Sequence, residues 1–101
     1  MGFQYGGCVY IMTNKMHTAL YTGVTSDLTG RVWQHKNHAY PNSYTAKYNC
    51  HKLVFYMFYP RIEEAIGAEK TLKGGNRKNK IKLINELNPK WLDLYDDLIN
   101  N

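Results

Sequence analysis

Residues 8–24 read CVYIMTNKMHTALYTGV, and this stretch decides the fold. It holds two short runs rich in β-branched and aromatic residues, Val9 to Met12 and Ala19 to Val24, joined by a polar segment. Such runs favour strands, and a polar connection of this length favours an antiparallel hairpin. Tyr10 and Tyr21 lie near the centres of the two strands. The hairpin is therefore expected to bring their rings together on one face of a sheet.

The chain after the hairpin alternates between helical and strand patterns. Residues 25–27 offer N-cap side chains for a helix from about Leu28 to Lys36, with Leu28 and Val32 on its buried face. Residues 38–49 predict a loop. The run Leu53 to Tyr59 is apolar throughout, as expected for a strand covered on both faces.

Two further helices follow Pro60. Apolar spacing predicts one that ends at Gly74-Gly75 and a second that Asn88-Pro89 stops, before a short closing helix or turn over residues 91–98. The residues expected on their apolar faces are Ile62, Ala65, Ile66, Glu69 and Leu72 in the first, and Ile81, Ile84 and Leu87 in the second. The order is β-β-α-β-α-α, which predicts a single α/β (α+β) domain, a small three-stranded antiparallel sheet flanked by helices.

The charge distribution indicates a polyanionic partner. The formal net charge is +5, and the segment from Lys70 to Lys90 holds seven basic residues against one acidic, Glu86. A basic segment of this kind favours nucleic acid, although a solvated basic helix explains it equally well. No apolar run approaches the roughly 20 residues of a membrane span, and no secretory signal is visible. Two cysteines are too few for a disulfide scaffold, so a cytoplasmic domain is expected.

Five residues are candidates for chemistry, and each has a structural alternative. Tyr10 and Tyr21 could be an ordinary cross-strand aromatic pair. Arg31 and His35 are one helical turn apart and project from the same face, which could be a solvent-facing basic stripe. Glu69 lies on or near an apolar helix face, where a carboxylate needs a partner or a metal. Alternatively, it lies at the edge of that face and pairs with a lysine at i+4.

The five residues together resemble the GIY-YIG nuclease family. The first family motif appears as Cys8-Val9-Tyr10 and the second, eleven residues later, as Tyr21-Thr22-Gly23. The segment 25–35 is similar to the family helix that carries an Arg and a His, and 64–73 to the helix that carries a Glu. The segment 87–95 is typical of the small single-domain bacterial branch, which is related to the N-terminal nuclease module of the UvrC excinuclease. The resemblance covers about residues 7–98.

This resemblance implies a metal-dependent endonuclease that hydrolyses phosphodiester bonds in DNA. One Mg²⁺ or Mn²⁺ ion on Glu69 would act as a Lewis acid, and Arg31 would clamp phosphate oxygens. Tyr10 or Tyr21 would be the general base, with Tyr10 favoured, and His35 would relay a proton or bind phosphate. The basic residues expected to bind neighbouring phosphates are Lys70, Lys73, Arg77, Lys78 and Lys80.

One departure from the family bears on this function. Several family nucleases carry a Lys two residues after the glycine of the second motif, where this chain has Thr25. A non-catalytic nucleic-acid-binding module of the same fold is therefore the alternative. A third class is an interaction protein that docks a partner on its aromatic surface. Metal dependence separates the first two, and salt-dependent binding to nucleic acid separates both from the third.

Overall fold

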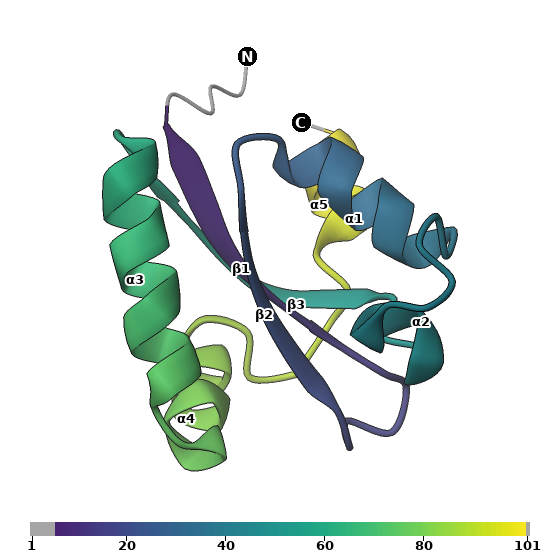
Figure 1. Cartoon of the computed structure of the whole chain (residues 1–101). Helices are drawn as coiled ribbons and strands as arrows, with labels where there is room; N and C mark the ends of the chain where they lie inside the picture. The colour runs from purple at the N-terminus through teal and green to yellow at the C-terminus, as the bar shows by residue number, and fades with distance from the viewer. Residues whose placement is uncertain (1–5, 101) are drawn as a thin grey trace.

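The computed structural model describes residues 6–100. In this part of the chain, a three-stranded antiparallel sheet has helices on both faces (Figure 1). The strands are β1 (Gly7–Thr13), β2 (Leu20–Thr25) and β3 (Lys52–Tyr59), and the helices are α1 (Leu28–Lys36), α2 (Tyr44–Lys47), α3 (Ile62–Gly74), α4 (Arg77–Leu87) and α5 (Tyr95–Ile99). This confirms the predicted fold class. Among the described residues, no helix is long and apolar enough to cross a membrane.

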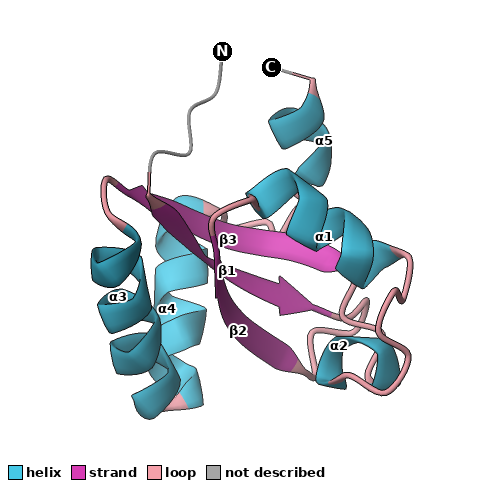
Figure 2. Ribbon diagram, turned by 45° about the horizontal axis from the view of Figure 1, so that its top comes forward, coloured by secondary structure: helices cyan, strands magenta, loops and turns pink. Residues whose placement is uncertain are grey.

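The sheet separates two apolar cores. Its strand order is β2-β1-β3, and both pairings are antiparallel. Helix α1 covers one face of the sheet, and α3 and α4 cover the other (Figure 2). Because side chains alternate along a strand, Tyr10 and Met12 of β1 pack in the core beneath α1, whereas Ile11 packs in the core on the other face. Cys8 and Cys50 are buried with free thiols in the first core.

Helix α1 begins where the sequence predicts, and its N-cap explains why the third residue of the helix is a glycine. Asp27 is the N-cap, and its side chain accepts a hydrogen bond from the Gly30 N–H at 3.1 Å. A Cβ at Gly30 would lie 2.2 Å from a carboxylate oxygen of Asp27. Leu28 and Val32 are fully buried, as expected, so α1 packs on the sheet through the predicted face.

Four expectations differ from the structure. The expected loop over residues 38–49 contains α2, a single turn capped by the Ser43 side chain. Ile66 and Leu87 are exposed, because α3 buries Ala65 and Glu69 and α4 buries Ile84. The prediction that Leu53 to Tyr59 is covered on both faces is also wrong for its second half. There Met57 and Phe58 are exposed, since the helices cover only the first half of β3.

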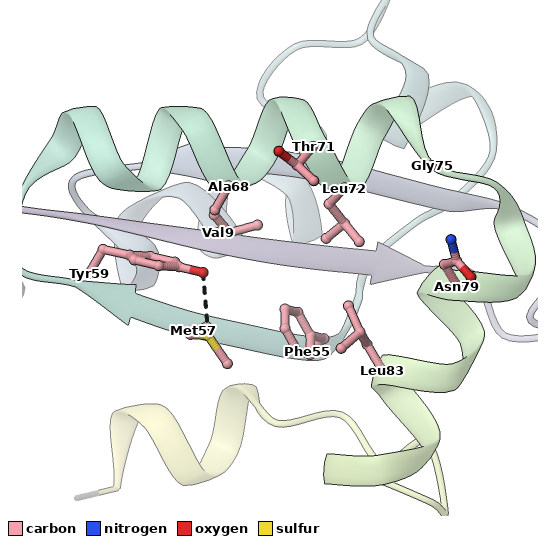
Figure 3. A pocket seen from close by; sticks show the side chains of 10 residues that line it. All are labelled: Val9, Phe55, Met57, Tyr59, Ala68, Thr71, Leu72, Gly75, Asn79 and Leu83. Atoms are coloured by element: carbon pink, nitrogen blue, oxygen red, sulfur yellow. Dashed lines mark hydrogen bonds between the residues drawn. The ribbon is translucent and has the colours of Figure 1, made fainter.

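An apolar pocket of about 400 Å³ lies beside the uncovered half of β3 (Figure 3). Its walls come from β1, β3, α3 and α4, with Val9, Phe55 and Leu83 among them. Tyr59 and Met57 close one end through a hydrogen bond from the phenol to the sulfur at 3.5 Å. The pocket belongs to the α3–α4 face, so the sheet separates it from Tyr10.

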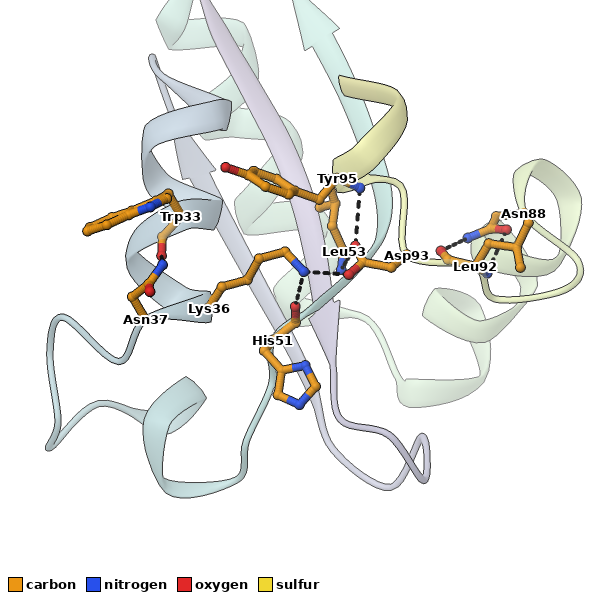
Figure 4. A network of polar contacts seen from close by, with 9 residues as sticks. All are labelled: Trp33, Lys36, Asn37, His51, Leu53, Asn88, Leu92, Asp93 and Tyr95. Carbon is orange, nitrogen blue, oxygen red and sulfur yellow. Dashed lines mark hydrogen bonds and ion pairs between the residues drawn. The ribbon is translucent and has the colours of Figure 1, made fainter. Parts of the chain in front are cut away.

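A polar clasp holds the C-terminal segment against the outer edge of β3 (Figure 4). Asp93 forms an ion pair with Lys36 of α1 and accepts backbone N–H groups of Leu53 and Tyr95, each at 3.1 Å. The Leu94 N–H donates to the Leu53 carbonyl at 2.8 Å. The clasp therefore covers the beginning of the β3 edge and ties it to α1.

Candidate active site

The hairpin places the two tyrosines side by side on the α1 face of the sheet. Tyr10 is fully buried and lies directly opposite Gly23 in the β1–β2 register. A Cβ at Gly23 would come within 2.5 Å of the Tyr10 hydroxyl oxygen, so the missing side chain makes room for this hydroxyl. The rings of Tyr10 and Tyr21 have centroids 6.2 Å apart and are tilted by 49°. The expected proximity of the two rings is confirmed.

Helix α1 contributes a histidine that binds the first tyrosine. The Nε2 atom of His35 lies 2.8 Å from the Tyr10 hydroxyl, and the His35 ring meets Tyr21 edge-on with centroids 5.4 Å apart. Arg31, one turn earlier on α1, places its positive charge beside both Tyr10 and His35. The common face of Arg31 and His35 is therefore directed at the tyrosines rather than at solvent alone.

Burial keeps the hydrogen-bonded pair neutral. It raises the pKa of Tyr10, as does the neighbouring Tyr21, while the Arg31 guanidinium opposes this increase. Burial and, to a smaller extent, the positive charge of Arg31 together lower the pKa of His35 to about 4. At neutral pH the site therefore holds a phenol hydrogen-bonded to an uncharged imidazole.

The other nitrogen of His35 is bound by α2. Its Nδ1 atom lies 2.8 Å from the hydroxyl oxygen of Thr45, which is 3.1 Å from the Ser43 hydroxyl. A neutral imidazole has one donor and one acceptor, so an Nδ1–H that donates to Thr45 leaves Nε2 to accept from Tyr10. The sequence prediction missed Thr45 because it lay in an expected loop. Ser43, as an N-cap ahead of a one-turn helix, was the available signal.

Glu69 of α3 combines the two alternatives that the sequence left open. It is only 9% exposed, and it also pairs with Lys73 at i+4, with 3.0 Å between Oε2 and Nζ. The same ammonium stands 5.9 Å from the centroid of the Tyr21 ring. The hydrogen bond to Glu69 raises the pKa of Lys73, which keeps this amine charged. Lys73 therefore connects the carboxylate to the tyrosine cluster.

A pocket of about 290 Å³ opens beside Tyr21, and we refer to it as the Tyr21 pocket. Its lining comprises Leu20, Tyr21, Thr22, Tyr44, Lys73 and Lys80. The hydroxyl of Thr22 is buried and has no hydrogen-bond partner within the part of the chain that the structure describes. Two ammonium groups in one pocket form a site that suits the oxygens of a phosphate group.

Comparison with known proteins identifies the family of the chain. The sequence model of the GIY-YIG catalytic domain matches residues 6–82. The chain belongs to the GIY-YIG family. Its fold is similar to the solution NMR structure of the UPF0213 protein BH0048 from Bacillus halodurans, with a TM-score of 0.55 and 28% sequence identity, covering 86% of this chain and 90% of that one. No curated protein matches the chain significantly.

GIY-YIG proteins form a nuclease family, and its members generally depend on a divalent metal ion. Within residues 6–100 no group of three or more His, Cys, Asp or Glu side chains could hold a metal. Glu69 is instead a single buried carboxylate whose oxygen already meets a cation, the Lys73 ammonium. A single carboxylate suits an ion that takes most of its ligands from water and substrate, as Mg²⁺ does, and Lys73 would have to yield one oxygen to it.

The basic residues expected to bind phosphate lie on more than one surface of the GIY-YIG domain. Lys73 and Lys80 line the Tyr21 pocket. Arg77 donates to the His17 carbonyl in the β1–β2 turn at 2.9 Å. Lys78 lines a separate open groove along α4, and Lys70 is exposed on α3. Lys73 and Lys80 are thus the two whose position relative to the tyrosines is defined by a shared pocket.

Proposed function

We propose that this GIY-YIG protein is an endonuclease that hydrolyses phosphodiester bonds in DNA in the cytoplasm, with one Mg²⁺ or Mn²⁺ ion. The observation that carries the proposal is the hydrogen bond between the buried Tyr10 hydroxyl and Nε2 of His35, with Arg31 beside it. A buried tyrosine held by an uncharged histidine is a proton-transfer pair, which hydrolysis of a phosphodiester requires.

In the proposed reaction, Tyr10 is the general base. The raised pKa of Tyr10 makes a free phenolate unfavourable, and the lowered pKa of His35 makes an imidazolium unfavourable. The two proton transfers must therefore be concerted, and the negative charge of the bound phosphate would have to stabilise the imidazolium. As Tyr10 takes a proton from the attacking water, its own proton passes 2.8 Å to Nε2 of His35. The imidazolium that forms keeps its Nδ1–H on Thr45. Tyr21 remains the alternative base, because its ring lines the Tyr21 pocket.

The phosphate would be bound between α1 and the Tyr21 pocket. Arg31 would hold two phosphate oxygens and counter the charge that develops during attack. The Lys80 ammonium would bind the remaining oxygens. Glu69 would hold the divalent ion, which supplies Lewis-acid chemistry at the scissile phosphate and support for the leaving oxygen.

Lys73 offers an answer to the missing family lysine. The position two residues after Gly23 is Thr25, whose hydroxyl instead bonds the backbone of Asp27. The ammonium of Lys73 reaches the Tyr21 ring from α3, on the other side of β2. We propose that this lysine provides the positive charge that other family nucleases take from the hairpin.

A non-catalytic binding module is the second candidate, and one observation favours it. Lys73 already neutralises Glu69 at 3.0 Å, so a divalent ion must compete with this ammonium for the carboxylate. If the competition fails, the Tyr21 pocket would still bind phosphate through its cations, but no hydrolysis would follow.

Cleavage of labelled single-stranded, double-stranded and branched DNA, with an RNA control, tests the proposal. We expect Mg²⁺-dependent cutting that EDTA abolishes and that Glu69→Gln lowers by about two orders of magnitude or more. Glu64→Gln is the matched control, because Glu64 lies on the same helix but is exposed. Cutting that survives Glu69→Gln would place the metal elsewhere, and salt-sensitive binding without any cutting would support the binding module.

A further inference from the structure

Exposed tyrosines recur at every fourth residue next to the candidate active site. They are Tyr40, Tyr44 and Tyr48, and the last two are each 43% exposed. Tyr44 opens α2 and Tyr48 is its C-cap, so one helical turn presents both rings on the same side. Exposed aromatic rings gathered in one place usually mark a binding surface rather than part of the core.

These rings continue the aromatic cluster of the site to the protein surface. The centroids of Tyr21 and Tyr44 are 6.1 Å apart with 31° between the ring planes, and those of Tyr44 and Tyr48 are 4.7 Å apart. Tyr44 also lines the Tyr21 pocket. A continuous series of three rings therefore leads from the proposed phosphate site outwards, and we refer to Tyr44 and Tyr48 as the outer pair.

The charges around the outer pair are positive. The ammonium of Lys47 stands 5.4 Å from the centroid of the Tyr48 ring, and Lys80 lines the Tyr21 pocket with Lys73. The sequence has no Asp or Glu between Asp27 and Glu63, the segment that includes α2. Aromatic faces combined with basic side chains bind nucleic acid strands, the bases stacking on the rings and the cations binding the phosphates.

The outer pair is fixed relative to the site rather than placed on a free loop. Thr45, between the two tyrosines, is buried, and its hydroxyl binds Nδ1 of His35. Its carbonyl accepts the Cys50 N–H at 2.8 Å, which anchors the end of the segment. The hydrogen bonds that orient His35 therefore also hold the outer pair at a constant distance from the Tyr10–His35 pair.

We propose that Tyr44 and Tyr48 are a stacking site for unpaired nucleobases that flank the phosphate in the Tyr21 pocket. This inference rests on the proposed function and names its substrate class. In a duplex the base faces are covered by neighbouring bases, so rings on the protein surface reach only unpaired nucleotides. The chain thus binds and cuts single strands, or unpaired strands at a junction, in preference to intact duplex. Because stacking is available to both DNA and RNA, the sugar is left to the experiment.

The test measures binding in EDTA, so that its outcome does not depend on cleavage. The probes are a fluorescent DNA strand of about 12 nucleotides, its duplex, an RNA strand of the same sequence, and a DNA strand with abasic sites at its centre. We expect the single strand to bind more tightly than the duplex. Tyr48→Leu, which keeps apolar volume but removes the ring, should weaken single-strand binding about fivefold to tenfold and duplex binding less than about twofold.

Two comparisons make the outcome decisive. Phe58→Leu removes an equally exposed ring from β3, at the opposite edge of the sheet from β2, and should change neither affinity. Abasic sites should weaken binding to the natural protein more than binding to the Tyr48→Leu variant, since the variant already lacks one of the two rings on which bases stack. Equal losses for strand and duplex, no loss at all, or an abasic strand that binds as tightly as the intact one would each overturn the stacking site. Cleavage that fails while selective single-strand binding persists would overturn the proposed function alone.

Discussion

Replacing Gly23 by Ala should disable the site through a single methyl group. Gly23 lies opposite Tyr10, and no described glycine has a positive φ, so close approach rather than backbone conformation requires glycine here. The added Cβ would lie 2.5, 2.6 and 2.9 Å from the hydroxyl oxygen and two ring carbons of Tyr10. The ring must therefore move by roughly 1 Å to restore ordinary contact distances.

The size of the effect follows from this displacement. A shift of this size away from His35 would lengthen the 2.8 Å hydrogen bond between Tyr10 and His35 beyond hydrogen-bonding distance and leave two buried polar groups unpaired. Overpacking a core costs about 1–3 kcal/mol, and an unsatisfied buried group costs a similar amount. We expect the free energy of unfolding to fall by about 2–4 kcal/mol. Cleavage by the protein that remains folded should fall about a hundredfold, because the base is misplaced by about 1 Å.

Gly67→Ala is the matched control. A Cβ at Gly67, on the exposed side of α3, meets nothing within 4 Å. The substitution should therefore stabilise the protein by up to about 1 kcal/mol and leave cleavage unchanged. Urea unfolding of both variants gives the stabilities, and the ¹⁵N shifts of the His35 ring report the loss of its bond to Tyr10. A Gly23→Ala variant with the stability and cleavage rate of the natural protein would refute this account of the second motif.

Two further predictions concern charge. Because the pKa of His35 falls from 6.5 to about 4 on folding, the unfolded chain binds the extra proton between these values. Stability should therefore be full above pH about 6.5 and decrease as the pH falls towards about 4. The pKa of His17 is also lowered, so the free energy of unfolding in urea is measured against pH for both the natural protein and His35→Gln. The difference between the two profiles gives the contribution of His35, and parallel profiles would contradict the prediction. Lys73→Met should raise the affinity of Glu69 for Mn²⁺ severalfold, measured by calorimetry without nucleic acid, because it removes the ammonium that pairs with the carboxylate. Lys70→Met changes an exposed neighbour and should leave the affinity unchanged. Equal affinities in both variants would show that Lys73 does not compete with the metal ion.

The parts of the fold that the sequence predicted depend on local patterns. The hairpin brought Tyr10 and Tyr21 together because strand side chains alternate, so two strands that pair must place their central residues on one face. Helix α1 followed from its cap and from the i, i+4 spacing of Leu28 and Val32.

The parts that it missed depend on contacts distant in sequence. Helix α2 is a single turn, too short to form by helix propensity alone, and it is held by the bond from Thr45 to His35. Spacing placed Ile66 on an apolar stripe, but the packing partner of α3 decides which part of the stripe is covered. The i, i+4 spacing predicted the pairing of Glu69 with Lys73 as one of two alternatives. It could not predict that Lys73 also lies beside the Tyr21 ring, because that contact joins two distant parts of the sequence.

The clasp at Asp93 has a consequence for the behaviour of the chain at high concentration. An unpaired edge strand invites the same strand of another molecule, and β3 offers eight residues, most of them apolar. The Leu94 N–H donates a hydrogen bond to the Leu53 carbonyl, and the Leu53 N–H donates one to the Asp93 carboxylate. These backbone groups at the beginning of the edge are therefore not available to pair with another molecule. Asp93 and Leu94 lie beyond the GIY-YIG match at residues 6–82. A segment outside the matched domain therefore protects the sheet against edge-to-edge aggregation, and a fragment trimmed to residues 6–82 would lack this protection.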